Sequence, residues 1–166
     1  MSSQLRTVYA NLADQVVTFT RENGTVAAIG ARDLHELKTA VQAADAPVRL
    51  LLPFSVYSEG REGQFASLDS VNRQDWYIVD LLLYKPAPLG ASIADIAPDV
   101  VRYQAAYLDM LRGFKDCSIV GGGSDVELVG WRVLPGVFRW PVDSIDEGAR
   151  WYAVMVTLQV MEIVAG

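Results

Sequence analysis

The spacing of apolar residues predicts a helix at the start of the chain and a short strand after it. Apolar residues recur every three or four positions over residues 4–19, which is the period of one face of an α-helix. Arg21-Glu22-Asn23-Gly24 comes next, and Gly24 is expected to end the helix in a left-handed conformation. The apolar run 25–29 then predicts a strand.

A shorter helix and a second strand are predicted before a long loop. Asp33-Leu34-His35-Glu36 has the spacing of a capping box, so a helix is expected over about 34–44. The leucine-rich run 48–54 predicts a strand. Residues 55–74 combine glycines, charges of both signs and few apolar positions, which predicts a loop long enough to have a functional role.

The middle of the chain predicts a buried strand and a well-defined helix. Both faces of 75–84 are apolar except at Asp80, which is typical of a central strand covered on both sides. A helix is expected over about 98–114, with Pro98 in its first turn. Its inward-facing residues are predicted to be Val100, Tyr103, Tyr107, Met110, Leu111 and Phe114.

The last part of the chain has the two-residue period of strands. The runs 125–133 and 137–140 are strand-like, and Leu134-Pro135-Gly136 between them predicts a bulge or bend. The clearest strand is 150–164, in which Tyr152 and every second residue after it predict a core face. The alternate face is mixed, as for a surface that meets solvent or a partner.

This order of elements predicts an α+β fold in a single domain over residues 1–166. Strands joined by hairpins, with helices packed on one face, make a two-layer sandwich around a mainly antiparallel sheet. A chain of 166 residues, 51% of them hydrophobic, buries enough surface to form its own core without a disulfide or a metal. The sequence contains neither an internal repeat nor a linker.

Charge and composition narrow the classes of function. The formal net charge is −6 and the basic residues are scattered, so sequence-specific nucleic-acid binding is not expected. The single cysteine, Cys117, excludes an intrachain disulfide and suits a reducing cytoplasm. The start of the chain lacks the pattern of a signal peptide, and no apolar run has the length of a membrane helix.

The residues that usually carry catalysis do not form a recognisable constellation. His35 is the one histidine and lies in a predicted first helical turn, without a nucleophile or an orienting acid at a known spacing. Cys117 is expected to act as a small buried hydrophobe. The glycines at 121–123 lack the lysine and the following helix of a phosphate-binding loop. We therefore predict no enzymatic activity, no cofactor and no metal site.

Asp80 is the exception that needs an explanation, because an unpaired carboxylate on an apolar strand is unfavourable. It is expected to pair with Arg49, Arg132 or Arg139, or to make a contact across a subunit interface. The competing hypothesis is a general base. The four tryptophans all lie in or beside predicted strands, where they fit a core or an interface equally well.

Taken in order, these segments resemble the tail terminator proteins of long-tailed bacteriophages, and more broadly the small tail-completion and head–tail joining proteins. The resemblance covers most of the chain. It rests on the long first helix, the strand that contains Arg49-Leu50-Leu51-Leu52-Pro53, and the long loop. It continues through the strand Trp76–Leu83, the helix Val100–Phe114 and the close Leu134–Trp140, and ends in the strand that begins Trp151-Tyr152-Ala153-Val154.

The resemblance implies a structural virion protein, located in the tail or neck and assembled in the host cytoplasm. Tail terminators form a hexameric ring that stops polymerisation of the tail tube and offers a surface to the head connector, and DNA passes through that ring. The implied partners are other copies of the chain, the tail tube protein and the head connector or neck protein. The family has no catalytic residues.

Two groups of residues are the candidates for subunit contacts. The first lies in the long loop, and the second stands at strand ends, where aromatic and arginine side chains serve as interface anchors. The six candidates are Arg61, Phe65, Arg73, Arg139, Trp140 and Trp151.

Three alternatives remain open from the sequence. The chain could be another phage neck or tail-tube protein. It could be a non-viral small-ligand binding module with a pocket between helix 98–114 and the sheet, lined by Tyr103, Tyr107, Trp76 and Trp131. The third alternative is an enzyme that uses Asp80 as its base.

Overall fold

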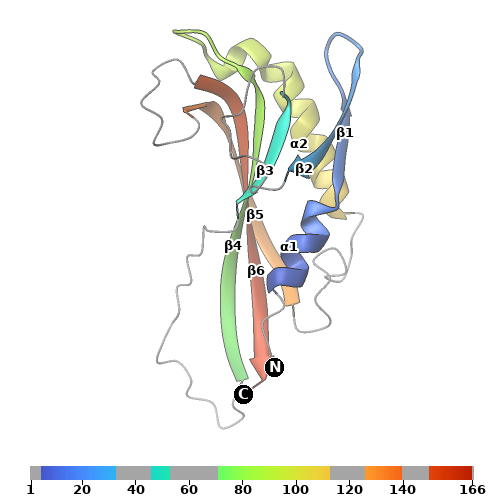
Figure 1. Cartoon of the computed structure of the whole chain (residues 1–166), viewed down its shortest axis with the longest axis vertical. Helices are drawn as coiled ribbons and strands as arrows, with labels where there is room; N and C mark the ends of the chain where they lie inside the picture. Colours follow the sequence, from blue (N-terminus) through green and yellow to red (C-terminus); the bar gives the residue numbers. More distant parts are fainter. Residues whose placement is uncertain (1–4, 33–45, 53–70, 113–125, 140–149, 166) are drawn as a thin grey trace.

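The structure, a computed structural model, describes residues 5–32, 46–52, 71–112, 126–139 and 150–165. These residues form a mixed fold in which two α-helices and one 3-10 helix pack on a curled, mainly antiparallel six-stranded sheet (Figure 1). The predicted α+β class is confirmed. The elements in chain order are α1 (Leu5–Ala13), β1 (Val16–Thr20), β2 (Val26–Arg32), β3 (Val48–Leu52), β4 (Val71–Pro86), η3 (Ile93–Ile96), α2 (Ala97–Arg112), β5 (Val126–Arg139) and β6 (Arg150–Ala165).

The strands follow the order β1-β2-β3-β4-β6-β5 across the sheet. All neighbouring pairs are antiparallel except β2 and β3, which run parallel and share a short register at Ala31 and Arg32. Because that contact is short, the β1–β2 hairpin can turn away from the main sheet and lie over α2 (Figure 1). The sheet therefore curls around α2.

The first predicted helix is too long. α1 ends at Ala13, and residues 16–20 form β1, whose side chains are alternately exposed and buried. The segment Val16-Val17-Thr18-Phe19-Thr20 is rich in β-branched residues, which lose side-chain freedom in a helix and pack well on a pleated strand. The three-residue spacing of Val16 and Phe19 fits a helical stripe, but in β1 it places the two side chains on opposite faces, with Val16 exposed and Phe19 buried. The β-branched composition was the signal for a strand.

Gly24 has the positive φ that the sequence predicts, 84°, but it serves a hairpin turn and not a helix end. The N–H of Gly24 donates to the carbonyl of Arg21, and the N–H of Arg21 donates to the carbonyl of Thr25. The side chain of Asn23 accepts from both the N–H and the hydroxyl of Thr25. These bonds join β1 to β2 through a tight, well-ordered connection.

β4 is a central strand, as predicted for 75–84, because it pairs with β3 on one side and with β6 on the other. It is longer than predicted and begins at Val71, so the last residues of the predicted loop 55–74 belong to a strand. The remainder of that loop and the predicted helix 34–44 lie outside the described residues. The lower parts of β4 and β6 pair beyond the level of α1 and form a long ribbon (Figure 1).

The predicted break at Leu134-Pro135-Gly136 is wrong. β5 is continuous, and these residues keep their register with Met155, Val154 and Ala153 of β6. The irregularity lies earlier, between Leu128 and Gly130. Pro135 is accommodated because β5 is an edge strand of the described sheet, where a missing N–H on the open side leaves no ladder bond unmade.

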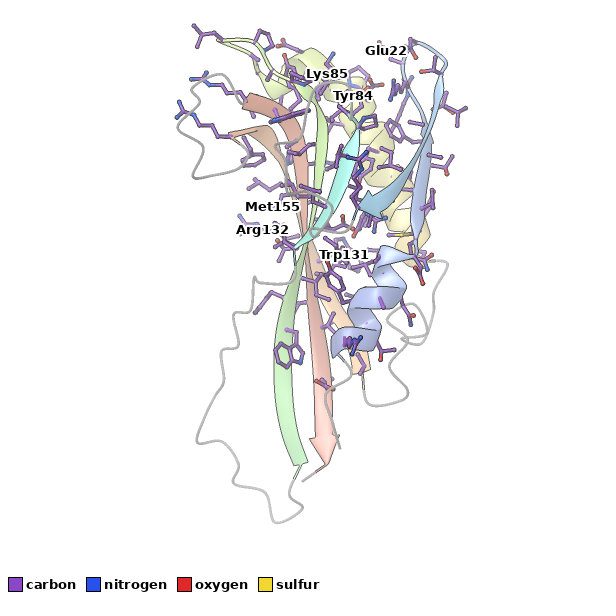
Figure 2. The ribbon with its side chains drawn as sticks, viewed as in Figure 1. Glu22, Tyr84, Lys85, Trp131, Arg132 and Met155 are labelled. Carbon is purple, nitrogen blue, oxygen red and sulfur yellow. The ribbon has the colours of Figure 1, made fainter. Side chains whose placement is uncertain are left out.

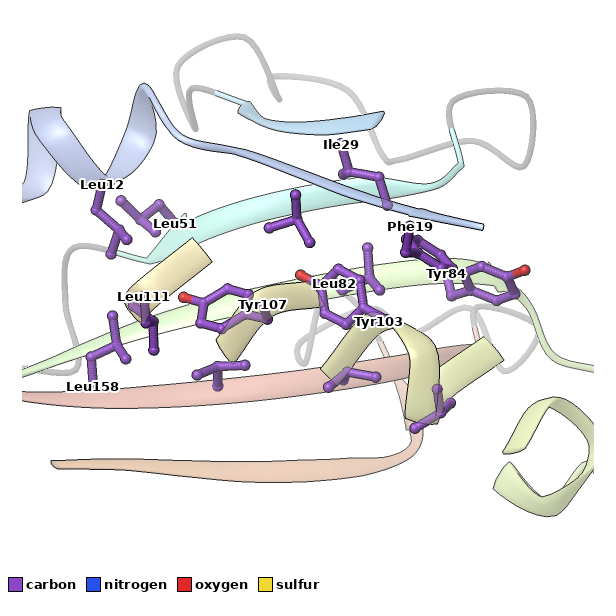
Figure 3. Packing of buried hydrophobic residues seen from close by; sticks show 14 of the residues in the cluster. Leu12, Phe19, Ile29, Leu51, Leu82, Tyr84, Tyr103, Tyr107, Leu111 and Leu158 are labelled. Atoms are coloured by element: carbon purple, nitrogen blue, oxygen red, sulfur yellow. The ribbon is translucent and has the colours of Figure 1, made fainter. Parts of the chain in front are cut away.

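The main core lies between the helices and one face of the sheet, which we call the helix face (Figure 3). α2 contributes Val100, Tyr103, Tyr107 and Leu111, as predicted, whereas Met110 is partly buried and Phe114 lies outside the described residues. Phe19 of β1 meets the edge of the Tyr103 ring, with ring centroids 5.6 Å apart. β6 supplies the predicted alternating core residues, which are Tyr152, Val154, Val156, Leu158 and Val160.

A second apolar cluster lies on the opposite face of the central strands, which we call the outer face. Its buried members are Val48, Leu50, Val79, Leu81, Leu83, Trp151 and Ala153. Because β3, β4 and β6 are apolar on both faces, they have the composition predicted for strands covered on both sides.

Candidate subunit-interface surfaces

Asp80 makes a buried ion pair with Arg49, which is one of the partners that the sequence predicts. Asp80 on β4 and Arg49 on β3 are diagonal neighbours on the helix face, and both are 0% exposed. The Nε of Arg49 donates to Oδ1 and Oδ2 of Asp80 at 2.9 and 2.8 Å, and its Nη2 lies 2.8 Å from Oδ2. This fork-to-fork geometry makes a strong, direction-specific pair.

The pair belongs to a network that connects four elements. The guanidinium of Arg49 also donates to the carbonyls of Leu12, at 3.1 Å, and of Gln15, so it caps the carboxyl end of α1. The hydroxyl of Tyr107 on α2 donates to Oδ2 of Asp80 at 2.7 Å. α1, β3, β4 and α2 are thereby held at one point, which is a structural function for the lone carboxylate.

The pKa values of the network fit this structural role. Burial alone lowers the pKa of Arg49, but the charge and hydrogen bonds of Asp80 outweigh it and raise that pKa above its ordinary value. Burial and the nearby carboxylate raise the pKa of Tyr107 well above 10. Arg49 therefore stays charged and Tyr107 stays neutral at neutral pH.

A general base has to reach a substrate, and Asp80 is 0% exposed with hydrogen bonds to both carboxylate oxygens. Within the described ranges, no three histidine, cysteine, aspartate or glutamate side chains gather as metal ligands. The hydrogen bonds and the ion pair of Asp80 and Arg49 hold α1, β3, β4 and α2 together.

A second polar cluster fixes the tip of the β1–β2 hairpin to the start of α2. Asp99 of α2 accepts from the backbone N–H of Glu22 at 2.7 Å through Oδ1, and from the hydroxyl of Tyr84 through Oδ2. The guanidinium of Arg21 lies over the Tyr84 ring, 5.7 Å from its centroid. Figure 2 shows Glu22 at the hairpin tip and Tyr84 nearby on β4. We call this cluster the Asp99 latch.

Acid should loosen the Asp99 latch. Burial raises the pKa of Asp99, but the bonds from Tyr84 and Glu22 outweigh it, so the folded-state pKa is lower than the usual value. The latch therefore contributes stability above the unfolded-state pKa of about 4 and loses it as the pH falls through the folded value. We expect Asp99→Ala to lower the free energy of unfolding by about 1–3 kcal/mol at pH 7, and this difference to shrink as the pH falls from about 5 to below the folded-state pKa.

Urea unfolding at each pH checks this expectation. Asp109→Ala is the matched control, because Asp109 is on the same helix but pairs with Arg112 at an exposed position. A difference between wild type and Asp99→Ala that stays constant across this pH range would show that the carboxylate does not hold the hairpin.

Strand β5 presents apolar side chains at the edge of the sheet. Val129, Trp131 and Leu134 are 43%, 54% and 39% exposed. Trp131 is opposite Leu158 and so lies on the helix face, whereas Leu134 is opposite Met155 and lies on the outer face. Figure 2 shows Trp131 on the side of α1, and Arg132 and Met155 on the other side. Apolar side chains therefore flank both sides of this edge.

The sequence-derived candidates fall into different places. Arg61, Phe65 and Trp140 lie outside the described residues. Arg73 is in β4 opposite Ile163, and only its backbone is described. Arg139 is exposed at the end of β5, in keeping with a contact surface.

Trp151, in contrast, is 4% exposed and belongs to the apolar cluster on the outer face. It lies opposite Phe138 of β5. Packing inside the chain accounts for this indole, because its register places it above the centre of the sheet and not at a free edge.

The rings that suggested a ligand pocket have core roles. Tyr103 and Tyr107 are both 1% exposed and pack among the side chains of the main core. The indole Nε1 of Trp76 donates to Oε2 of Glu162 at 3.0 Å. Aromatic packing and one hydrogen bond explain these three side chains without a ligand.

The comparisons with known proteins do not name a family for this chain. No protein-family model matches it, and no curated protein matches its sequence. In the part of the chain that the structure describes, no helix is both long and apolar enough to cross a membrane.

Sequence patterns could have pointed to Trp131 only in part. Its exposure depends on the position of β5 at the sheet edge, which the strand order decides. The sequence gives no reason to single out Glu22 or Arg150, because a turn residue and the first residue of a strand are ordinary places for a charged side chain. Glu22 stands out in the structure because its backbone N–H donates to Asp99. Arg150 stands out because it lies directly opposite Arg139 in the β5–β6 pair.

Proposed function

We propose that this chain is a structural virion protein of a long-tailed bacteriophage, a tail terminator whose copies form a hexameric ring that caps the tail tube and meets the head connector. The observation that carries the proposal is the apolar edge strand β5. A 14-residue strand at the edge of the described sheet carries Val129, Trp131 and Leu134 as exposed side chains. A long exposed edge with apolar residues is a surface that proteins use for assembly.

Further features support contacts through side chains. Pro135 lacks the N–H needed to extend a ladder, and the irregularity between Leu128 and Gly130 interrupts the edge a second time. These interruptions disfavour continuous strand addition, and Trp131 then serves as an anchor residue. The polar groups of the buried network around Asp80 bond to one another and stabilise the fold, which suits a subunit whose role is assembly.

The first experiment is the mass of the purified protein by light scattering, with negative-stain images of its shape. We expect a closed ring of about six subunits, and we expect the ring to stop elongation when it is added to polymerising tail tube protein. Filaments of this chain alone would favour the tail-tube alternative. A monomer at all concentrations that neither binds nor shortens tubes would overturn the proposal.

Trp131→Ala should weaken assembly and leave the fold intact. The side chain is 54% exposed in the single chain, so its loss has little effect on unfolding, whereas an aromatic anchor contributes about 2 kcal/mol or more to an interface. We expect the subunit concentration at half-assembly to rise roughly 30-fold in dilution series followed by light scattering. Val101→Ala, at an apolar site of α2 that is 63% exposed, is the control and should have no effect. Equal effects of the two variants would exclude a specific role for Trp131.

A further inference from the structure

The carboxylate of Glu22 is presented at a fixed position. Its backbone N–H is held by Asp99, and the turn around it is closed by the bonds among Arg21, Gly24 and Thr25. The side chain itself is exposed and makes no hydrogen bond or ion pair within the described residues. The backbone of Glu22 is therefore ordered, and its carboxylate is accessible to a binding partner.

Arg139 and Arg150 form a positively charged pair at the opposite edge of the sheet. They stand directly across from each other at the ends of β5 and β6, so their side chains share one face. Neither side chain has an acidic partner among the described residues. Like charges in directly opposed positions destabilise a strand pair, and a bound anion between them removes that repulsion. A carboxylate fits this site, because two guanidinium groups can donate to its two oxygens.

The two features lie on opposite sides of the molecule at the same level. In Figure 1 the hairpin tip and the adjoining ends of β5 and β6 are both at the upper end of the long axis, on its two flanks. A contact between two different surfaces is heterologous, and it closes into a ring when successive copies stay at one level. We infer that the carboxylate of Glu22 binds between Arg139 and Arg150 of a second copy of this chain.

This contact rests on the proposed ring function and defines its chemistry. Opposite charges on the two flanks match one copy to the next and exclude the reverse arrangement, in which tip meets tip and arginine pair meets arginine pair. In a chain with a net charge of −6, copies repel one another unless specific charges of opposite sign meet at the interface. The Asp99 latch would then act on assembly, because it fixes the backbone of Glu22.

Charge reversal tests the contact. Glu22→Arg alone, and Arg139→Glu with Arg150→Glu, should each lower the subunit association constant by about tenfold to hundredfold, measured by light scattering in dilution series. A 1:1 mixture of the two variants should restore assembly, because each then offers the charge that its neighbour requires. The triple variant that carries all three reversals should also assemble.

The controls carry the same charge changes at sites outside the contact. Asp109→Arg and Arg112→Glu are at exposed positions of α2, away from β5 and the hairpin tip, and should leave the association constant unchanged. A wild-type ring whose association constant is the same in both charge-reversed variants would overturn the contact and leave the ring function standing. A wild-type chain that never assembles would overturn the ring function itself. Loss of assembly without restoration in the mixture would also refute the pairing.

Discussion

Asp80→Ala is expected to lower the free energy of unfolding by about 3–5 kcal/mol, one of the two largest effects of any single substitution proposed for this chain. The reason is that the substitution leaves the guanidinium of Arg49 buried at 0% exposure without its counter-charge. The hydroxyl of Tyr107 loses its acceptor at the same time. Urea unfolding followed by circular dichroism, at one fixed protein concentration, measures the change.

A double-mutant cycle separates the pair from its surroundings. Arg49→Met should be strongly destabilising by itself, because Asp80 loses its partner and the carbonyls of Leu12 and Gln15 lose their donor. The variant with both Arg49→Met and Asp80→Ala should lose less unfolding free energy than the sum of the losses of the two single variants. The difference, which is the coupling energy, should be about 2 kcal/mol or more. Additive effects would contradict the assignment of the pair as the point that joins α1, β3, β4 and α2.

The ion pair is a case in which sequence reasoning reached a structural contact. A single carboxylate on an apolar strand requires a partner, and few cations stood on neighbouring apolar strands. Sequence could not choose among Arg49, Arg132 and Arg139, because the choice depends on strand order. In the structure β3 is a neighbour of β4, whereas β5 is separated from it by β6.

The errors have equally local causes. The stripe of residues 4–19 satisfied a helical period although its last part is a strand, in which Val17 and Phe19 face the core and Val16 is exposed. The Pro135-Gly136 signal predicted a bend that the structure does not contain, because an edge strand tolerates proline without losing a ladder bond. Trp151 is an interface candidate from its place at a strand start, and the apolar cluster that buries it within the single chain is visible only in the structure.

The proposed contact surfaces were the least accessible to sequence reasoning. Arg139 and Arg150 are opposed only through the register of the β5–β6 pair. Glu22 is distinguished from other turn residues by a backbone hydrogen bond to Asp99, which is 77 positions away in the chain. Such relations depend on tertiary structure, and no local period or propensity encodes them.

The continuous register of β5 with β6 leads to the second large prediction, which concerns proline. Val156 is in β6 between Asp80 of β4 and Val133 of β5, so its strand has paired neighbours on both sides. We expect Val156→Pro to lower the free energy of unfolding by about 3 kcal/mol or more, because it removes a ladder bond and introduces the proline ring into a paired strand. A loss of this size is a large fraction of the stability of a typical domain.

Val137→Pro is the matched substitution at the edge. Val137 is two residues from Pro135, so in a regular strand its N–H points to the same open side and makes no bond to β6. We expect Val137→Pro to unfold in urea close to wild type, with a loss of no more than about 1 kcal/mol, in the same measurement that shows Val156→Pro largely unfolded. Similar losses for the two variants would mean that the open side of β5 is already paired. If Val137→Pro keeps its fold and also assembles as wild type does, copies of the chain meet through side chains such as Trp131, and not by extending the sheet through this part of β5.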